Sequence, residues 1–520
     1  MENFLNGHPL RQIVHFCLVI ALLILPACGG GERPLIILVP VNSQTLDPHF
    51  ATSTVELSIL MNVFDSLITR RADMSLAPGL AERWEVDDSR RIWTFHLKKG
   101  IKFTNGEPFD SRSVKFTFNR MENSKFQSGN AISRRISFGR LETVNEHTVR
   151  LHTKRPVATL PNWLVNAFML PPRYYSETPA GEVKFQPVGS GPYKIVANQS
   201  ANEIRMEANE TWWNGKPRIP SVLWRTVPKA KDRVSQLQEG KADLITTISP
   251  HEGLLVSSIK GSQMKSIPGG RRIYIGIRQT FGPFKDKRVR QAMNHALNFG
   301  QISQRLLNGH GFRLASIVNK PGADPSIRPY SYDPRKAKAL LAEAGLKDTD
   351  GDGILEKNDI PLSLKIDVPL ARYLKGREMT ALIIRQLGAV GIKVELNPLK
   401  WTAFLERRRN NAFSPLYFHG FSSDFNEELD LGVLRPNLQR NLTHWIHPPF
   451  IDGYTRLSQT FAPNKRKKLS HKLQRIVREE APWIFLWNQY DFYGLGPNVE
   501  WTPRPDERIY LPSIVLEETN

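Results

Sequence analysis

The second half of the chain alternates strands with helices, and this alternation limits the possible fold more than any other feature. Apolar residues follow a strand pattern over 362–368 and 392–396. The stretch between them, 379–390, has helical spacing and stops at Gly391. A strand, a helix and a second strand in this order form a βαβ unit. The pattern therefore predicts α/β lobes.

The same two periodicities place further elements along the chain. Helices are expected at 55–68, from Asp110, at 286–297, from Asp333 to Gly345 and around 465–477. Strands are expected at 35–41, 91–98, 148–152, 193–196, 203–206 and 273–277. One side of the helix at 55–68 carries Leu57, Leu60, Met61, Phe64, Leu67 and Ile68. No fixed-period repeat is present, which excludes solenoid folds.

The first 28 residues contain a short apolar run that leads to a cysteine. The run from Phe16 to Leu25 is too short to cross a bilayer, which takes about 20 residues, but it suits the core of a secretory signal. Cys28 and the residues before it resemble a bacterial lipobox, with Pro26 where Ala or Ser is commoner. We predict a signal peptide at 1–27 and lipid attachment at Cys28. The alternative is a buried N-terminal helix, which the glycines at 29–31 disfavour.

The remaining chain lacks cysteine and is strongly basic. Cys17 is the only other cysteine, so the mature chain has neither a disulfide framework nor a thiolate metal site. The length implies two or three lobes. The net charge of +21 is spread along the chain, and the run at 465–468 begins a helix whose solvated face it forms. Attraction to anionic lipid, or an acidic medium, explains this charge, and no nucleic-acid partner is expected because no basic-aromatic motif is present.

The common catalytic motifs are absent from the sequence. There is no Gly-x-Ser-x-Gly elbow, no His-Glu-x-x-His and no phosphate loop. The Gly189–Pro192 segment lacks the third glycine of a dinucleotide loop, and we interpret it as a tight turn before a strand. His444 and His447 stand one turn apart, but no carboxylate is near them to complete a metal site. We predict that the protein is not an enzyme and that it needs no cofactor.

An acidic segment at 348–359 has the spacing of a calcium loop. Oxygen donors at its first, third, fifth and twelfth positions are Asp348, Asp350, Asp352 and Asp359, and Gly353 follows the third of them. Asp stands where Glu is usual at the last position, and a strand follows where a helix is expected. A plain acidic turn is the alternative to a structural calcium site.

Several motifs of the chain resemble those of the extracellular solute-binding proteins of family 5, the peptide-binding lipoproteins that serve ATP-driven importers. The resemblance covers nearly the whole mature chain in order. Its motifs are Trp84-Glu85-Val86, Trp93 to Phe103, Asn105 to Phe109, Gly189 to Tyr193, Pro283 to Ala292, Tyr332-Asp333-Pro334, Ala344-Gly345 and Pro482 to Leu486. The acidic turn at 348–353 also recurs in this family, mostly without calcium.

This resemblance implies the two-lobed periplasmic-binding-protein fold of type II, in its large form with an inserted subdomain. Lobe I would comprise 28–59, 186–272 and 489–520, with the inserted subdomain at 60–185. Lobe II would span 273–488. Two crossover strands would form a hinge, so that closure encloses the ligand and signals its presence to a permease.

The resemblance also implies a ligand site. Asp424, in the segment 420–425, matches the carboxylate that receives a peptide ammonium, with Phe421 in place of a tryptophan. Arg372 matches a position where some dipeptide binders hold the carboxylate, and a planar guanidinium suits that task. The alternatives are an exposed loop carboxylate and a surface charge. Trp401, Trp445 and Trp487 could line the pocket or belong to the core.

These expectations combine into one functional prediction. The protein is a monomer, lipid-anchored in the periplasm or on the cell surface, that captures short peptides and delivers them to the permease and ATPase subunits of an importer. A nickel chelate, an opine or a sugar is the alternative ligand on the same fold. A peptide-binding sensor or chaperone without an importer stays open, and a secreted peptide hydrolase is disfavoured because no nucleophile–base pair or metal site is visible.

Overall fold

The computed structural model describes residues 33–123, 138–200, 202–318, 321–369, 372–436 and 441–517. The predicted signal peptide at 1–27 and the lipid site at Cys28 lie outside these ranges. Within them, no helix is both long enough and apolar enough to cross a membrane.

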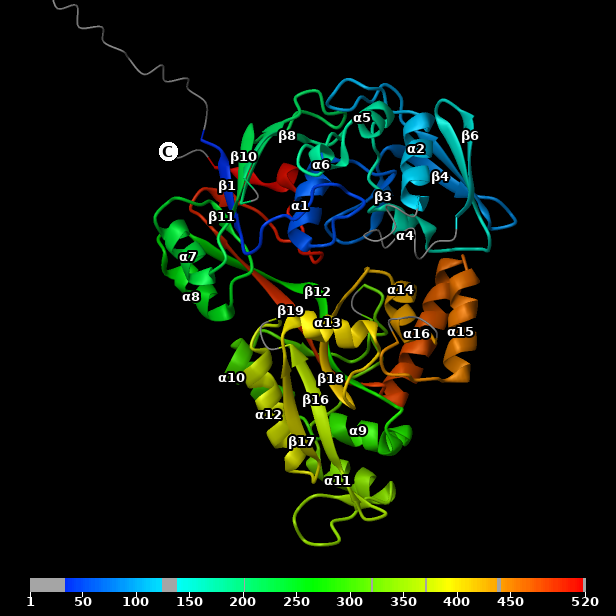
Figure 1. Ribbon diagram of the computed structural model, residues 1–520, viewed down its shortest axis with the longest axis vertical. Helices are drawn as coiled ribbons and strands as arrows, with labels where there is room; N and C mark the ends of the chain where they lie inside the picture. The colour runs from blue at the N-terminus through cyan, green and yellow to red at the C-terminus, as the bar shows by residue number, and fades with distance from the viewer. Residues whose placement is uncertain are drawn as a thin grey trace, which may run out of the picture. The chain divides into compact units, whose positions relative to one another are not determined.

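An 11-stranded mixed sheet runs through the centre of the described chain (Figure 1). Its strands, in spatial order, are β17 (Lys393–Leu399), β16 (Ser363–Pro369), β18 (Leu416–Ser422), β12 (Gln263–Ile277), β19 (Trp483–Leu495), β11 (Leu244–Ile245), β1 (Leu35–Val39), β10 (Ser221–Thr226), β9 (Glu203–Ala208) and β8 (Tyr193–Ser200), with β13 (Phe312–Arg313) paired to β19. The strands β16, β17 and β18 are parallel, as are β1, β10 and β11. The helix α12 (Gly376–Gly388) connects β16 to β17, which confirms the predicted βαβ unit and the α/β class.

Two long strands, β12 and β19, belong to both halves of this sheet (Figure 1). Residues 263–268 of β12 pair with residues 490–495 of β19, and pairing resumes at Arg272 opposite Asn488 after an irregularity. Gly269 and Gly270 occupy the irregularity, where an added Cβ would collide with Asp491 and crowd Phe425. These strands are the two predicted crossover strands, and their ladder is interrupted where they pass from one lobe to the other.

Lobe II, named here by its predicted range 273–488, surrounds the half of the sheet that contains β16, β17 and β18. Two buried apolar clusters fill it, one around Ile275 and Met293 and the other around Tyr274 and Trp483. Its other elements are η2 (Gly282–Lys285), α9 (Lys287–His295), α10 (Phe299–Leu307), α11 (Pro334–Glu343), β14 (Glu356–Lys357), β15 (Ile360–Pro361), α13 (Trp401–Arg409), α14 (Glu427–Leu431), η3 (Gly432–Leu434), α15 (Pro448–Gln459) and α16 (Pro463–Glu480).

Lobe I, named by its predicted segments, contains the half of the sheet around β1. Trp224 and Leu495 belong to its main buried cluster, and a second cluster lies under α7 and α8. Its remaining elements are α1 (Thr54–Val63), α7 (Ala230–Gln238), α8 (Pro250–Ser258), β20 (Val499–Glu500), η4 (Leu511–Ser513) and β21 (Val515–Leu516).

The inserted subdomain has a sheet and a core of its own. Four antiparallel strands in the order β4-β5-β7-β6 pack with α2 around Trp93, Phe95 and Phe118. Its elements are β2 (Ile68–Arg70), β3 (Leu76–Pro78), β4 (Ala81–Val86), β5 (Ile92–Leu97), α2 (Ser111–Glu122), β6 (Phe138–Asn145), β7 (Thr148–Thr153), α4 (Leu160–Leu164), α5 (Pro172–Glu177) and α6 (Ala180–Val183). The predicted domain boundaries stay a prediction.

Most predicted elements are present near their expected positions. Asp110, Asp286 and Asp333 each accept a hydrogen bond from a backbone N–H in the first turn of α2, α9 and α11, as N-cap residues do. The basic helix α16 buries Leu473 and Val477, so its charged residues form the opposite, solvated face.

The predicted helix at 55–68 was wrong at its C-terminal end. Helix α1 ends at Val63, because Phe64 is extended (φ −122°, ψ 153°). The carbonyl of Val63 accepts a hydrogen bond from Gly191 N at 2.9 Å, and any side chain at Gly191 would overlap this backbone. The Gly189–Pro192 segment is thus a close-packed turn before β8, and contacts remote in sequence end the helix. Ile68 is still buried, but in strand β2.

Candidate ligand-binding cleft

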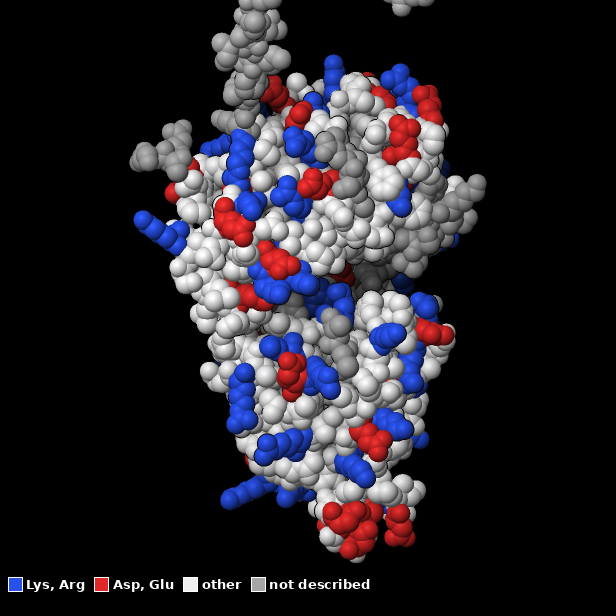
Figure 2. All heavy atoms as spheres, turned by 60° about the vertical axis from the view of Figure 1, so that its left-hand side comes forward, with Lys and Arg blue, Asp and Glu red and all other residues white. Residues whose placement is uncertain are grey.

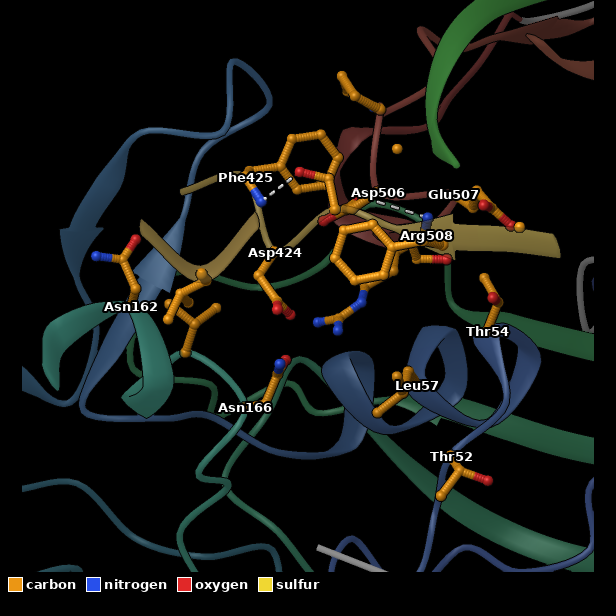
Figure 3. A pocket seen from close by; sticks show the side chains of 18 of the residues that line it. Thr52, Thr54, Leu57, Asn162, Asn166, Asp424, Phe425, Asp506, Glu507 and Arg508 are labelled. Atoms are coloured by element: carbon orange, nitrogen blue, oxygen red, sulfur yellow. Dashed lines mark hydrogen bonds between the residues drawn. The ribbon is translucent and has the colours of Figure 1, made fainter. Parts of the chain in front are cut away.

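A cavity of about 450 Å³ lies between lobe I, the inserted subdomain and lobe II. We call it the cleft cavity. Figure 3 shows labelled side chains from each part directed toward it, among them Thr54, Asn166, Asp424 and Arg508. Its lining is Pro48, Ala51, Thr52, Thr54, Leu57, Arg70, Asn162, Trp163, Val165, Asn166, Gly270, Tyr274, Arg408, His419–Phe425, Leu429, Val433, Leu442 and Pro505–Arg508.

The lobe II wall is the loop that follows β18, and Asp430 holds this loop in place. The buried Asp430 carboxylate accepts hydrogen bonds from Ser423 Oγ at 2.8 Å and from the backbone N of Asp424 at 3.2 Å. The guanidinium of Arg272, on β12, pairs with both oxygens of Asp430 at 2.6 and 2.9 Å. Asp424 follows directly and is half-buried at the cavity, and its backbone position is set by this buried network. Figure 3 shows its side chain directed into the cavity.

Local backbone chemistry explains why the chain turns at this point. Phe425 has a left-handed backbone (φ 51°), and its N–H donates to Ser423 Oγ at 2.9 Å. Asn426 then caps α14 by accepting from Glu428 N and Leu429 N. Ser and Asn side chains form such turns and caps. This short segment therefore places Asp424 at the cavity wall, just before the helix begins.

Aromatic side chains line the lobe II side behind Asp424. Phe421 is half-buried at the cavity with the Arg272 guanidinium 4.6 Å from its ring centroid. Tyr274 stacks on Trp483 with ring centroids 3.6 Å apart. Burial lowers the pKa of His419 to about 3, and nearby Arg408 adds to this effect. His419 is therefore neutral at physiological pH. Lobe II gives the cavity aromatic side chains, the carboxylate of Asp424 and the guanidinium of Arg408.

The opposite wall is rich in arginine. Arg70 Nη1 donates to Met74 O at 2.8 Å, and its Nη2 donates across the cleft to the backbone carbonyl of Asp424 at 3.3 Å. Arg504 binds both oxygens of Asp506 at 3.0 and 2.7 Å. Glu507 lies 3.4 Å from Arg271 Nη2. Each acidic residue of the 504–508 segment thus already faces an arginine.

Arg508 differs from these neighbours. Its backbone N–H donates to Asp506 Oδ1 at 3.3 Å, but among the described residues no hydrogen bond or ion pair is formed by its guanidinium. The guanidinium interacts electrostatically with Asp424, Asp506 and Arg504. In Figure 3 the Asp424 and Arg508 side chains point toward the same part of the cavity.

A second cavity of about 180 Å³ adjoins the cleft cavity. The two share Arg70, Val165, Asp506 and Arg508 as lining residues. Asp65 stands in the second cavity, where it accepts from Trp213 Nε1 and Ser190 Oγ, each at 2.9 Å. Burial raises the pKa of Asp65 to about 6. Arg508 therefore stands on the boundary between the two cavities.

The structure brings only some of the predicted site residues to the cleft cavity. Asp424 and Phe421 line it. Arg372 is exposed and lies outside the lining, with its guanidinium 5.1 Å from the ring centroid of half-buried Trp401, which is outside the lining as well.

The structure buries Trp445 and Trp487 in apolar cores, which is the alternative that the sequence left open for them. Trp445 is 2% exposed and packs on His447 and Phe450. Trp487 is 1% exposed and stacks on Phe299 of α10. Neither lines the cleft cavity, and burial of the large apolar indole explains their positions.

Sequence reasoning missed the lobe I wall. Arg70, Asn162, Asn166 and Arg508 come from segments far apart in the chain, and no motif marks them. Asn166 Oδ1 is buried without a hydrogen-bond partner among the described residues, although Asn166 lines the cavity. The only available signal for Arg508 was its place in a charged segment after Pro503 and Pro505, which is equally typical of a surface loop.

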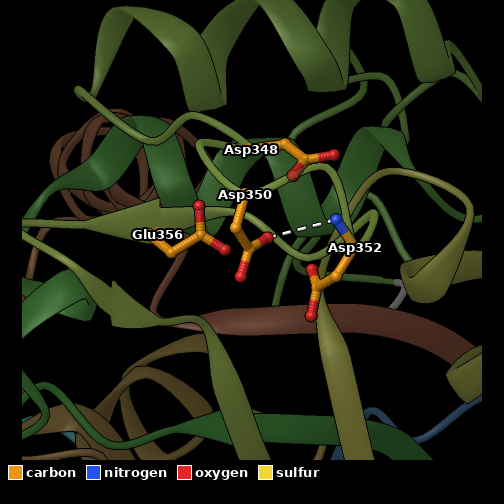
Figure 4. A group of neighbouring side chains, drawn as sticks. All are labelled: Asp348, Asp350, Asp352 and Glu356. Carbon is orange, nitrogen blue, oxygen red and sulfur yellow. Dashed lines mark hydrogen bonds between the residues drawn. The ribbon is translucent and has the colours of Figure 1, made fainter.

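The acidic turn gathers a different set of residues from the one predicted. Asp348, Asp350, Asp352 and Glu356 have ligand atoms within 4.8 Å of one another (Figure 4). Asp359 is not part of this group, because it lies in the exposed turn between β14 and β15 with φ 60°.

Backbone N–H groups already bind the carboxylates of this acidic turn. Gly351 N and Gly353 N donate to Asp348, and Thr349 N donates to Glu356 at 2.7 Å. These bonds account for the turn without an ion, and calcium binding stays a prediction. Figure 2 shows this acidic group as a red cluster at one tip, whereas Lys and Arg side chains are spread over the rest of the visible face.

A family profile and curated relatives both match most of this chain. The profile described as bacterial extracellular solute-binding proteins, family 5 Middle, matches residues 75–431. The glutathione-binding protein GsiB of Shigella boydii is 25% identical over 482 residues, which are 89% of this chain and 91% of that protein. GsiB of Escherichia coli K12 is 24% identical over the same shares of the two chains.

Solved structures share the fold of the chain. AppA of Bacillus subtilis, in complex with a nonapeptide, has a TM-score of 0.77 at 22% identity and covers 94% of this chain and 99% of its own. NikA of Brucella suis, in complex with Fe(III)-EDTA, has a TM-score of 0.83 at 22% identity, and the alignment covers 94% of this chain and 100% of the NikA chain. DppA of Helicobacter pylori is a periplasmic binding protein in complex with the peptide STSA. It has a TM-score of 0.77 at 21% identity, and the alignment covers 94% of this chain and 98% of the DppA chain. The predicted two-lobed periplasmic-binding-protein fold of type II is confirmed.

Proposed function

Because this chain belongs to the bacterial extracellular solute-binding proteins of family 5, we propose that it captures short peptides in the cleft cavity and delivers them to an ATP-driven importer. The family consists of solute-binding proteins, and we propose no enzyme activity. Binding and release of an unmodified ligand are the steps that this function requires of the chain.

The observation that carries the proposal is the position of Asp424. Its carboxylate lies at the cavity, and its backbone is fixed by the buried Asp430–Arg272 pair. A peptide ammonium that loses its water on binding needs a carboxylate partner, because an unpaired buried ion costs several kcal/mol. Asp424 supplies that partner on the lobe II wall, whose lining also includes the guanidinium of Arg408. Asn166 Oδ1, which lacks a donor among the described residues, can accept from a backbone N–H of the same ligand.

The size of the cavity supports a short ligand. Small-molecule sites occupy roughly 300–1,000 Å³, and about 450 Å³ lies in the lower part of that range. Among the similar proteins, GsiB is named for glutathione, a tripeptide, and the DppA structure contains the peptide STSA. AppA holds a nonapeptide, so the fold also admits longer ligands.

The ligand carboxylate has two candidate partners. Arg372 is the candidate from the sequence; it is exposed outside the lining, where it interacts electrostatically with Glu507 of the lining. Arg508 is the candidate from the structure, and it lines the cavity itself. Closure of the lobes about β12 and β19 would enclose the bound peptide and present a changed surface to the permease.

The proposed location follows from the N-terminal segment. We propose that the protein acts as a monomer in the periplasm or on the cell surface, tethered through a lipid on Cys28 and partnered by the permease and ATPase subunits. A tether keeps the protein at high local concentration next to its permease, so moderate affinity suffices for transport. No nucleic-acid partner is proposed.

A metal chelate is the second candidate ligand, and the arginines of the lobe I wall favour it. NikA, which shares the fold, binds Fe(III)-EDTA, and the carboxylates of such a chelate would suit Arg70 and Arg508. Asp424 opposes it, because a carboxylate repels an anionic chelate. Opines and sugars have no specific observation in their favour.

Two measurements test the proposal. Mass spectrometry of small molecules released from denatured protein should detect peptides, and calorimetry should show saturable binding of dipeptides or tripeptides. Binding of Fe(III)-EDTA or nickel complexes with no peptide binding would replace the proposal by the chelate alternative. Cleavage of peptides during incubation with the purified protein would restore the hydrolase alternative.

A further inference from the structure

The lobe I wall contains a cation that the surrounding protein does not neutralise by direct contact. Arg508 is half-buried between the cleft cavity and the second cavity, and its guanidinium forms no hydrogen bond or ion pair within the described part of the chain. A guanidinium presents five N–H donors, and that of Arg508 lines the cavities, where a ligand can reach it. An anion in the cavity would satisfy them.

The carboxylates nearest to Arg508 in the chain are already bound elsewhere. Both oxygens of Asp506 accept from Arg504, and Glu507 pairs with Arg271. Arg70 adds a second positive charge beside Arg508. Burial lowers the pKa of Arg70, and the like charge of Arg508 lowers it as well. Burial is also the largest cause that lowers the pKa of Arg508, and Arg504 lowers it further. Cationic groups therefore outnumber unbound anionic groups on this wall.

Arg508 faces Asp424 across the cleft cavity. The two side chains interact electrostatically but form no ion pair with each other, and both are directed into the same space (Figure 3). A cation-binding group and an anion-binding group directed into one small cavity match the two ends of a zwitterion. Bidentate pairing between guanidinium and carboxylate would also fix the direction of the ligand.

We propose that Arg508 binds the carboxylate of the ligand, so that the cleft selects short zwitterionic peptides with a free C-terminus. This inference rests on the proposed function, in which Asp424 binds the ammonium. Arg70 supports the bound carboxylate electrostatically, while its own N–H groups hold Met74 O and Asp424 O. Because both ends are held within one cavity of about 450 Å³, a peptide of two or three residues fits and a long extended peptide does not.

The experiment compares one dipeptide with its two end-blocked forms. Calorimetry measures the affinities of Ala-Leu, of Ala-Leu amide and of N-acetyl-Ala-Leu for the wild-type protein and for four variants: Arg508→Gln, Arg508→Lys, Arg372→Gln and Asp424→Asn. A hydrogen bond to a charged group predicts that the wild type prefers the free acid to the amide by about tenfold to a hundredfold. Arg508→Gln should reduce this ratio to near one, and Arg508→Lys should retain part of it.

The controls separate Arg508 from the other charges. Arg372→Gln should keep the full acid-to-amide ratio. Asp424→Asn should keep that ratio as well, but lose the preference for the free amine over the acetylated form. A melting temperature close to the wild-type value shows that each variant is folded. If Arg508→Gln fails to fold, the partial reduction of the acid-to-amide ratio in Arg508→Lys tests the role of Arg508.

Three results would overturn the inference. An unchanged acid-to-amide ratio in Arg508→Gln would show that Arg508 does not bind the carboxylate, and collapse of the ratio in Arg372→Gln would assign that role to Arg372. If Arg508→Gln lowers the affinities for Ala-Leu and Ala-Leu amide equally, Arg508 only balances the charge of Asp424. If the wild type binds none of the three compounds, the proposed function fails first and this inference with it.

Discussion

The two walls of the cleft are built in different ways. On the lobe II wall, Ser423, Asp424 and Asp430 lie within eight residues of sequence and are joined by direct hydrogen bonds. On the opposite wall, Arg70 and Arg508 come from distant segments, and Arg508 has no hydrogen-bond partner for its guanidinium among the described residues. The first wall is preorganised before the ligand binds. On the second wall, the guanidinium of Arg508 would gain its hydrogen-bond partner from the ligand.

This difference suggests a division of labour. A loop whose backbone is held by a satisfied buried network changes little on binding, so Asp424 on this loop defines where the ligand begins. A guanidinium without a partner gains most from the ligand, so it discriminates among ligand ends. Loss of the lobe II network should therefore affect stability and binding together, whereas changes on the other wall should affect specificity.

The largest effect is expected for Asp430→Ala. The substitution leaves the fully buried Arg272 guanidinium without its carboxylate, and breaking one side of a buried pair costs about 3–5 kcal/mol. The free energy of unfolding, measured by denaturant titration, should fall by this amount, and peptide affinity should fall with it. In the double variant Arg272→Met/Asp430→Leu, part of the stability should return. A loss below about 1 kcal/mol in Asp430→Ala would contradict the anchoring role.

The next effect is expected for Asp424→Ala. Removal of the carboxylate leaves the peptide ammonium unpaired, which costs about 2–5 kcal/mol of binding free energy, or at least about thirtyfold in affinity. The melting temperature should change little, because the Asp430 network contacts the backbone N of Asp424 and not its carboxylate. Calorimetry with a dipeptide measures the affinity. If both quantities match the wild type, Asp424 is not the ammonium site.

The same contrast explains which parts could be predicted from the sequence. Asp424 and Phe421 lie in one contiguous segment that resembles a family motif, and the βαβ unit at 363–399 follows from local periodicity. Arg508 could not be predicted, because its role depends on segments that only the folded chain brings together. The C-terminal end of α1 was missed for the same reason, since Gly191 and Ser190 determine where that helix stops.

The tryptophans could not be assigned to pocket or core from the sequence, for a different physical reason. Their size makes them equally suited to a pocket and to a core, and sequence spacing does not distinguish the two. Trp487 faces α10 because it alternates along β19 with residues that point to the other face of the sheet. Only the packing of the lobe reveals which face meets the cavity.

A smaller effect is expected at the hinge that joins the two walls. Asp491 on β19 is half-buried; its Oδ1 accepts from Gln489 Nε2 at 3.2 Å, whereas its buried Oδ2 has no hydrogen-bond partner among the described residues. Burial, and then the negative charge of Glu507, raise its pKa well above the usual value. A raised folded-state pKa means that the folded protein holds the proton more tightly, so stability falls as the pH rises from about 4 toward that pKa.

Asp491→Asn should remove this loss of stability. At pH 7 the variant should be more stable by about 1–3 kcal/mol, and the gain should shrink as the pH approaches 4. Thermal denaturation from pH 4 to 8 measures it, with the exposed Asp452→Asn on α15 as the matched control. A destabilised Asp491→Asn at pH 7, or a gain that is independent of pH, would show that Asp491 is not a buried carboxylate under strain.

The smallest effect is expected for Arg372→Gln. This arginine is exposed and outside the cavity lining, and its guanidinium approaches the Trp401 ring centroid to 5.1 Å. Exposed charges contribute about 0–1 kcal/mol, so stability should change by less than about 0.5 kcal/mol and dipeptide affinity by less than about threefold. Calorimetry at low and at physiological salt would detect any long-range contribution, because screening weakens it. A tenfold loss at physiological salt would mean that the closed, ligand-bound cleft recruits Arg372, and that the lobe II wall binds both ends of the peptide.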